Sequence, residues 1–357
     1  RPDWHRDIDS VTLQGDFFRN SLASSTQVEG GNILGRWTRR LSETSGVELQ
    51  GYYDRVERLT PGVTDRLETF DIAGQYNVRL GASHDLVLGG GFRNSVEEFT
   101  NTVNSFVLRP EEDTVRLGNI FVQDSIALHE DVTLTLGNKF EHNSHTGLEL
   151  MPNARLAWRI TDSTMLWSAV SRAVRTPSRF DRDLQATGIL DPADDFKSET
   201  VIAYEAGIRT QPTDVTSLSV SVFYNDYDDL RVLGTAPSGR LFFSNRMHGT
   251  TYGVETWGDY RVRDWWRLSA GFTYLDKDLK LEPGASTTAL DQHQGNDPDY
   301  QASLRSSMDI TKDVDWDIGI RFVDNLTRPV VPGYVALDTR IGWDVTENIE
   351  VSLAGFN

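Results

Sequence analysis

The 357-residue sequence contains no cysteine, which excludes disulfide bonds and thiolate metal sites. No apolar run approaches the roughly 18 residues of a membrane-spanning helix, so helical membrane insertion is also excluded. Basic residues are in deficit, because 35 Lys and Arg stand against 53 Asp and Glu, giving a formal charge of -18. Phosphate recognition needs a basic surface, so this balance argues against a nucleic-acid partner.

Glycine is plentiful, with 29 residues, and nine tryptophans contribute to a 10% aromatic share, a composition that suits an all-β chain with many turns. Alternating or β-rich segments recur along the whole chain without a convincing amphipathic helix or a linker-like break. Residues 1–357 are therefore predicted to form one domain. We expect about seventeen strands, at residues 10–19, 31–42, 46–57, 66–80, 84–99, 114–128, 132–143, 147–161, 164–177, 200–211, 216–232, 241–262, 266–280, 300–311, 314–326, 334–345 and 349–357.

The connections between these segments alternate in length. Short, turn-forming connections lie near residues 42–46, 81–83, 129–131, 161–163, 212–215, 263–265, 311–313 and 346–348. The intervening connections are expected to be long, at residues 20–30, 58–65, 100–113, 178–199, 233–240, 281–299 and 327–333, except for a short one near 142–146. Tight turns at one end and large loops at the other are typical of an outer-membrane barrel. The long segments agree, because a globular strand averages about five or six residues and a tilted membrane strand needs about 9–11.

The stretch TSLSVSVFYNDYDDL at 216–230 shows how the two faces differ. Its apolar face carries Leu218, Val220, Val222 and Tyr224, and its small polar face carries Ser217, Ser219 and Ser221. Similar alternation occurs at 132–141, 266–274, 316–322 and 335–344. In a transmembrane antiparallel β-barrel the apolar face meets lipid and the polar face lines the lumen. We therefore expect the serine face to point inward.

Several motifs resemble those of TonB-dependent outer-membrane receptors. The stretch SRAVRTPS at 171–178 resembles the "SRAFRTPS" stretch of that family, and SET at 198–200 followed by YEAG at 204–207 resembles its "E-T…YE-G" strand. FVQD at 121–124, YGVE at 252–255 and the final AGFN at 354–357 fall in the same order as in the family. The resemblance covers nearly the whole sequence.

This resemblance implies a twenty-two-stranded barrel with an N-terminal plug domain in its lumen. By this comparison the chain holds strands five to twenty-one and is expected to be a fragment lacking the plug, the TonB box, the first four strands and the last one. The implied function is active uptake of a scarce nutrient across the outer membrane of a Gram-negative bacterium, most often a ferric siderophore and in some branches haem, cobalamin or a glycan. The implied partners are the TonB–ExbB–ExbD complex, membrane lipid and a siderophore-like molecule. The family performs no catalysis, and the ferric chelate is cargo rather than a cofactor.

Loop 178–199 is the first candidate for substrate contact, because it follows and contains a cluster of arginines that suits an anionic chelate. The candidate substrate-binding residues are Arg172, Arg175, Arg179, Phe180, Arg182, Tyr227, Phe242 and Phe243. Loop 281–299 is a candidate lid. The alternative is that the arginines pair with Asp181, Asp183 and other lumen acids, and that the aromatic side chains meet lipid or the rim.

Two candidate metal sites carry less specific patterns. His142, His145 and Glu141 in EHNSHTG combine two imidazoles with a carboxylate, although histidines in loops are usually solvated. Asp191, Asp194 and Asp195 suggest calcium, but their spacing is nonspecific and solvated acids look the same. The sequence has LDPADDFKSET where haem receptors carry an "NPNL"-like motif, which weakens haem as the substrate.

Two rival classes remain open at this point. A passive porin-like channel has the same strand pattern but closes with an even number of strands and needs no plug. A barrel enzyme needs a catalytic Ser–His or Asp–His group at its rim, and no Ser–His–Asp arrangement is identifiable in the sequence.

Overall fold

The computed structural model describes residues 3–5, 9–22, 25–102, 106–193, 195–285, 287 and 293–357. Its one helix with assigned bounds in that part of the chain is α1 (Arg179–Arg182). The strands are β1 (Asp3–His5), β2 (Asp9–Leu22), β3 (Thr26–Arg40), β4 (Ser45–Thr60), β5 (Val63–Leu80), β6 (His84–Asn101), β7 (Phe106–Leu108), β8 (Glu112–His129), β9 (Val132–Asn143), β10 (Gly147–Thr161), β11 (Thr164–Arg175), β12 (Leu184–Ala186), β13 (Leu190–Asp191), β14 (Glu199–Thr213), β15 (Thr216–Thr235), β16 (Leu241–Arg263), β17 (Trp266–Leu281), β18 (Tyr300–Thr311), β19 (Val314–Val323), β20 (Leu326–Thr327), β21 (Val330–Val331), β22 (Tyr334–Thr346) and β23 (Ile349–Gly355).

Among the described residues, no helix has both the length and the apolar character required to cross a membrane.

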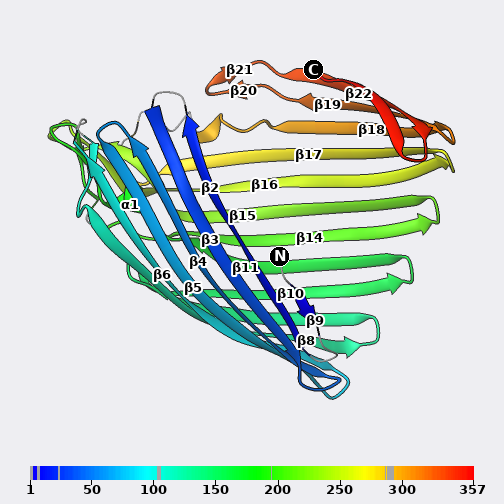
Figure 1. Ribbon diagram of the computed structural model, residues 1–357, viewed down its shortest axis with the longest axis horizontal. Helices are drawn as coiled ribbons and strands as arrows, with labels where there is room; N and C mark the ends of the chain where they lie inside the picture. The colour runs from blue at the N-terminus through cyan, green and yellow to red at the C-terminus, as the bar shows by residue number, and fades with distance from the viewer. Residues whose placement is uncertain are drawn as a thin grey trace.

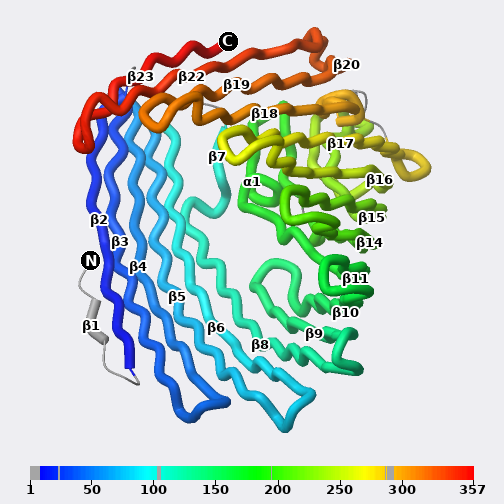
Figure 2. The backbone as a smooth tube through the Cα atoms, turned by 90° about the vertical axis from the view of Figure 1, so that its right-hand side faces the viewer, coloured from blue at the N-terminus to red at the C-terminus, as the bar shows by residue number. Residues whose placement is uncertain are grey.

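The long strands form one continuous antiparallel sheet in which each strand pairs with the next long strand along the chain. The order is β2, β3, β4, β5, β6, β8, β9, β10, β11, β14, β15, β16, β17, β18, β19, β22 and β23. The sheet is strongly curved, so that β2–β8 form one wall and β11 and β14–β17 form the facing wall (Figures 1 and 2). The predicted all-β, antiparallel architecture is confirmed, and the long strands pair in chain order.

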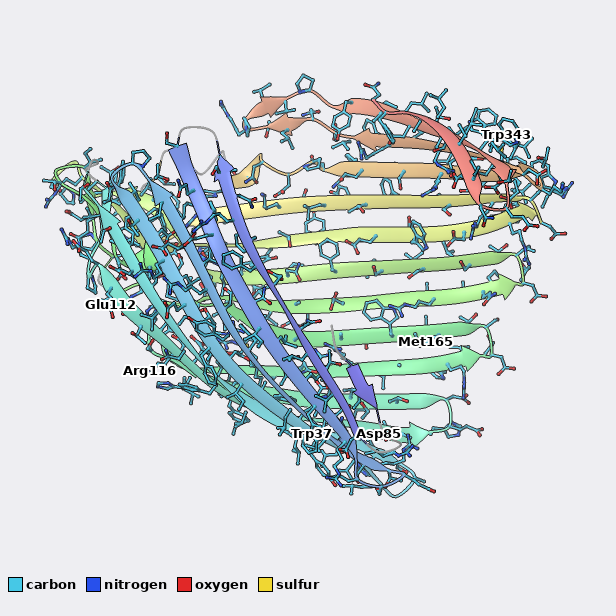
Figure 3. All side chains as sticks on the ribbon, in the orientation of Figure 1. Trp37, Asp85, Glu112, Arg116, Met165 and Trp343 are labelled. Atoms are coloured by element: carbon cyan, nitrogen blue, oxygen red, sulfur yellow. The ribbon has the colours of Figure 1, made fainter. Side chains whose placement is uncertain are left out.

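The two ends of the sheet differ, and we call them the turn end and the loop end. The turn end has the two-residue connections at 130–131, 162–163, 214–215, 264–265, 312–313 and 347–348, together with those at 41–44 and 81–83. The loop end carries α1 and the large connections 102–111, 176–198 and 282–299. Figure 3 shows this separation on one wall, with Glu112 and Arg116 near the loop end and Trp37 and Asp85 near the turn end.

Each of the seventeen predicted segments corresponds to one long strand, but two predicted long loops are wrong. Residues 20–30 and 58–65 are mostly strand, because β2 and β3 stay paired as far as Leu22 and Thr26, and β4 and β5 as far as Thr60 and Val63. Pro61 and Gly62 close the second hairpin, and Gly62 supplies the positive φ of 79° that this turn needs. Beyond the bilayer a strand needs no apolar face, so its charged residues resemble a loop in the sequence.

The predicted outer face is apolar and exposed. On β15 Leu218, Val222 and Tyr224 are exposed, while the intervening serines Ser219 and Ser221 line an inner hollow of about 500 Å³. The serine face therefore points inward, as the alternation predicts. Water contact with so many large side chains is unfavourable, at roughly 25 cal/mol per Å² of apolar area, whereas lipid removes that cost.

A row of tyrosines crosses the outer face toward the loop end. Tyr204, Tyr224, Tyr252, Tyr274 and Tyr300 come from five neighbouring strands, β14 to β18. Neighbouring rings in this row lie close, with centroid separations of 6.3 Å for Tyr204–Tyr224 and 5.1 Å for Tyr274–Tyr300. Such a belt has the composition expected at a membrane interface, where the ring contacts acyl chains and the hydroxyl contacts water.

The buried apolar side chains gather at the loop end. Val232, Met247 and Leu279 form one cluster, against which Leu230 and Leu281 pack. Short strands also join the loops to one another. The strand β7 pairs with β12, β12 pairs with β13, and β13 pairs in parallel with the start of β16. The loop end is thus a packed structure rather than a set of independent loops, and it positions the candidate site.

Candidate functional site

The helical turn α1 is fixed by a capping box that the sequence encodes as SRFD. Ser178 is the N-cap, and its backbone N–H and hydroxyl each donate to Oδ2 of Asp181 at 2.9 Å. The reciprocal bond, from the Asp181 N–H to Ser178 Oγ, is 3.4 Å long. The box satisfies backbone groups that a short helix otherwise leaves open, and it fixes the direction of the Asp181 carboxylate.

The Asp181 side chain also accepts hydrogen bonds from two arginines. Arg231 Nη1 lies 2.7 Å from Oδ1, and Arg175 Nη1 lies 3.2 Å from Oδ2. Asp181 is completely buried, with 0% of its side chain exposed, whereas Arg175 and Arg231 are 49% and 43% exposed. Burial alone raises the pKa of Asp181, but the bonds from Arg231 and Ser178 and the charge of Arg175 outweigh it and lower the pKa below its ordinary value. The carboxylate is therefore ionised at neutral pH.

Glu199, the first residue of β14, holds the same two arginines from a second side. The guanidinium Nε of Arg175 donates to Oε2 of Glu199, and the backbone N–H of Arg231 donates to Oε1 at 2.7 Å. The Arg231 guanidinium lies over the ring of Phe243, 5.4 Å from its centroid. A cation above an aromatic face is attracted by the ring quadrupole, so the Phe243 ring helps to hold the Arg231 guanidinium in place.

These groups open onto a pocket of about 570 Å³ at the loop end of the inner face. The pocket is lined by Arg175, Glu199, Phe223, Asn225, Tyr227, Leu230, Arg231, Met247, Thr251, Leu275, Lys277, Leu279, His293, Asn296 and Asp297. Its volume falls within the range of small-molecule sites, about 300–1,000 Å³. Three cations beside an aromatic and aliphatic floor suit an anionic ligand that also has flat apolar surface.

Lys277 and His293 also line the pocket. Lys277 donates through Nζ to Asn296 Oδ1 at 2.7 Å and to the carboxylate of Asp297, which fastens residues 293–297 to β17. His293 is partly buried, and that burial together with the positive charges of Arg231 and Lys277 lowers the pKa of its imidazole below the ordinary value. His293 is therefore neutral at pH 7.

The aromatic floor depends on a glycine in the neighbouring strand. Phe223 on β15 pairs with Gly253 on β16, and a Cβ at Gly253 would stand 2.6 Å from Cζ of the ring. The same Cβ would stand 2.1 Å from the backbone oxygen of Tyr274, so the position has no room for a side chain. The absence of a side chain at Gly253 lets the ring lie along the sheet and leaves the pocket open.

Of the predicted substrate-contact residues, Arg175 and Tyr227 line the pocket. Phe243 does not line it but contacts Arg231, which does. Arg179 has a different environment, with only 3% of its side chain exposed. Its Nε donates to Asp183 at 3.0 Å, and its other nitrogens donate to the backbone oxygens of Glu97, Pro110 and Glu111. Arg179 thus joins α1 to the connection before β8, and it lies outside the pocket lining.

The remaining predicted contact residues also lie outside the lining. Arg172 donates to the backbone oxygen of Leu150. Both residues lie on the loop-end side of Asn153 and Ser171, where the pairing of β10 with β11 ends. Phe180 is exposed on α1 and Arg182 is half-buried there. Phe242 pairs with Asp191 of β13. For these four residues, substrate contact stays a prediction.

The metal hypotheses find little geometric support. Glu141 is buried and its neighbour His142 is exposed, because successive residues of β9 point to opposite faces. His145 is instead bonded to Asp113, with Nε2 3.2 Å from Oδ2. These three side chains therefore do not converge on one metal. Asp191 forms an ion pair with Arg240 at 3.1 Å, and Asp194 lies outside the described residues. Of the candidate lid 281–299, residues 286 and 288–292 also lie outside them.

Several pocket residues were not among the predicted contacts, although some carried a signal. Lys277 lies on the inward face of β17, opposite the outward Phe272 and Tyr274, so alternation alone marks it as a lumen residue. Arg231 lies after a register shift between Tyr227 and Leu230, where Asp229 has a positive φ of 54°. Arg231 has the same parity as the inward Ser219 and Ser221, so alternation also marks it as a lumen residue, although the shift changes how β15 pairs with β16 there.

Comparison with known proteins assigns the family. The family model described as "TonB dependent receptor-like, beta-barrel" matches residues 1–357. The probable TonB-dependent siderophore receptor PirA of Acinetobacter baumannii is 21% identical over 267 residues, which are 66% of this chain and 34% of that protein. The pesticin receptor of Yersinia enterocolitica is 25% identical over 231 residues, 61% of this chain and 32% of that protein. The chain thus spans about a third of the length of these two curated relatives.

Solved structures agree on the fold. The siderophore receptor PirA from Pseudomonas aeruginosa matches with a TM-score of 0.78 at 17% identity, over 99% of this chain and 64% of that one. A mutant of the ferric enterobactin receptor PfeA from the same organism matches with a TM-score of 0.80 at 13% identity, over 99% and 62%. The family match, together with the sequential antiparallel sheet and its apolar outer face, leads to one conclusion. This chain belongs to the TonB-dependent receptor family and forms a β-barrel of the outer-membrane type.

Proposed function

We propose that the protein containing this chain is an active outer-membrane receptor that takes up a ferric siderophore. The cargo binds in the pocket at the loop end, which faces the cell exterior, and passes through the barrel when TonB, with ExbB and ExbD, transmits the energy of the proton gradient. No covalent bond of the cargo changes in this process. The proposed role is transport rather than catalysis.

The observation that carries the proposal is the combination of charge and apolar surface in the pocket. Arg175, Arg231 and Lys277 offer guanidinium and ammonium donors, and Phe223 and Tyr227 offer flat ring surface. Ferric chelates of catecholate or carboxylate type are anionic, and catecholates also carry aromatic rings, so both features have a counterpart in such a ligand. The relatives support the same class, since they include proteins named as siderophore receptors and a ferric enterobactin receptor.

The test is uptake of radioactive iron by the full-length receptor in cells. A strain lacking the gene is grown under iron limitation and complemented with the wild type or with Arg231→Gln. Labelled iron(III) complexes of a tris-catecholate, a tris-hydroxamate and citrate are supplied separately. We expect the wild type to restore uptake of at least one complex and Arg231→Gln to lower its apparent affinity about tenfold, since a charge-assisted hydrogen bond is lost.

Arg305→Gln is the matched control, because Arg305 also pairs with an acid, Asp317 at 3.2 Å, but lies on β18 outside the pocket lining. Its uptake should equal that of the wild type. Uptake that persists after deletion of TonB would point to a passive channel. Restored growth on cobalamin, haem or a glycan without any ferric uptake would replace the siderophore as cargo.

A further inference from the structure

The pocket without ligand carries no net charge among its paired ionic groups. Its three cations, Arg175, Arg231 and Lys277, contact three carboxylates. Arg175 pairs with Glu199, Arg231 with Asp181, and Lys277 with Asp297. His293, whose imidazole is neutral at pH 7, adds no charge. An anion that enters is therefore attracted by cations whose fields are already offset by nearby acids.

Asp181 differs from the other two acids in position and in contacts. Glu199 and Asp297 line the pocket, whereas Asp181 approaches the arginines from outside the lining and is completely buried. It also bonds to the guanidinium groups of both pocket arginines, whereas Glu199 reaches Arg231 through its backbone N–H. A charge in a buried setting is weakly screened by water, so its influence on the two guanidinium groups is larger than that of an exposed carboxylate at the same distance.

The arginines keep free donors on their pocket side. Arg175 uses Nε for Glu199 and Nη1 for Asp181, and Arg231 uses Nη1 for Asp181. A guanidinium has five N–H groups, so each arginine retains several for a ligand. Asp181 thus holds the two guanidinium groups from outside the pocket lining and offsets their charge, and it leaves their other donors open to a ligand.

We propose that Asp181 sets the charge selectivity of the pocket, so that a ligand must carry several negative charges to compete for Arg175 and Arg231. This inference rests on the proposed function of the pocket as the siderophore site. It concerns which ferric complexes are accepted. A multiply charged ligand outweighs the single carboxylate, while an uncharged complex gains little from the two arginines.

The experiment compares two ligands rather than one affinity. Asp181→Asn is introduced in the full-length receptor, and equilibrium binding of an anionic iron(III) tris-catecholate and a neutral iron(III) tris-hydroxamate is measured in detergent. Removing the buried charge should raise the affinity ratio, anionic over neutral, by about tenfold. If Asp181 only maintains loop structure, its loss changes both affinities by the same factor and the ratio stays constant, which overturns the proposal.

Asp183→Asn is the control, because Asp183 lies on the same loop but pairs with the buried Arg179. It should leave the ratio unchanged even where it loosens the loop. Should the wild type bind neither ferric complex, the siderophore function fails, and citrate is then compared with its uncharged triamide at the same pocket. A ratio that rises for Asp181→Asn in that pair supports the charge role independently of iron, and an unchanged ratio ends it.

Discussion

Arg175 ends β11 and Arg179 begins α1 four residues later, yet the two arginines occupy opposite environments. Arg175 is half-exposed, lies between the carboxylates of Glu199 and Asp181, and faces the pocket. Arg179 is buried and is surrounded by Asp183 and three backbone oxygens. An arginine whose donors go to backbone oxygens has no alternative partner, whereas one held by carboxylates at a pocket surface retains donors for a ligand. Arg179 is therefore structural, and Arg175 is available for binding.

The largest effect is expected from the buried arginine. Arg179→Met leaves the Asp183 carboxylate without its cation and removes the guanidinium bonds to the backbone oxygens of Glu97 and Pro110. Breaking a buried pair in this way costs about 3–5 kcal/mol. Loop 178–193 should then lose protection in hydrogen-exchange mass spectrometry, while the barrel strands keep theirs. Arg175→Met serves as the comparison and should leave most of that protection in place. Equal loss of protection in both variants would erase the distinction between the two arginines.

A smaller effect, on ligand binding rather than on loop stability, is expected from the pocket arginine. Arg175→Gln removes donors that face the ligand, and one lost charge-assisted hydrogen bond weakens binding by about 1.5–3 kcal/mol, or roughly 10- to 150-fold. Equilibrium binding of the iron(III) complex that the wild type transports measures this change. The variant should retain loop protection, because Ser178, Arg179 and Arg231 still hold the loop. Unchanged affinity would remove Arg175 from the site.

The smallest effect concerns pH and extends the comparison to His293, which faces the same cations. Its pKa lies below the ordinary value of 6.5, so the neutral form dominates at pH 7. As pH falls below about 6.5 the ligand-free site becomes less stable, because protonation adds charge beside Arg231 and Lys277. A bound anion favours the protonated form and raises this pKa, so affinity should increase as pH falls through that window. A rise of half a unit corresponds to about threefold.

The control for the pH experiment is His293→Gln, which removes the titrating group and keeps a polar side chain. Protonation of the chelator itself affects both proteins alike, so the ratio of their affinities isolates the imidazole. A ratio that is flat between pH 7.5 and 5.5 would exclude His293 from the electrostatics of the pocket. A ratio that falls with falling pH would reverse the sign of its role.

Strand number and facing were accessible from the sequence because they depend on a local period of two. Leu218 and Ser219 are neighbours, and lipid on one side and water on the other require opposite chemistry at successive residues. The same rule failed for residues 20–30 and 58–65. There the strands extend past the expected loop boundaries with charged residues such as Glu29, Arg58 and Asp65. Without a membrane on one side, alternation carries no information.

The candidate site was only partly accessible, since the arginine-rich motif indicated Arg175 and also Arg179. The two residues have the same type and charge, and their environments differ because loop packing gives them different partners. Arg231 comes from a strand 50 residues beyond Asp181 and joins the site only because β15 lies beside β14, whose first residue is Glu199. Pairings of that range are set by sheet order and loop packing rather than by spacing.

The sequence by itself determined that the chain makes an antiparallel barrel with a lipid-facing and a water-facing side, because solvent contact acts on each residue separately. Only the tertiary structure decided which cations reach a ligand. The contact of Arg231 with Asp181, and the backbone oxygens of distant residues that enclose Arg179, are relations between segments far apart in the chain. The energy of each depends on geometry that forms only when the whole sheet curves and its loop end packs.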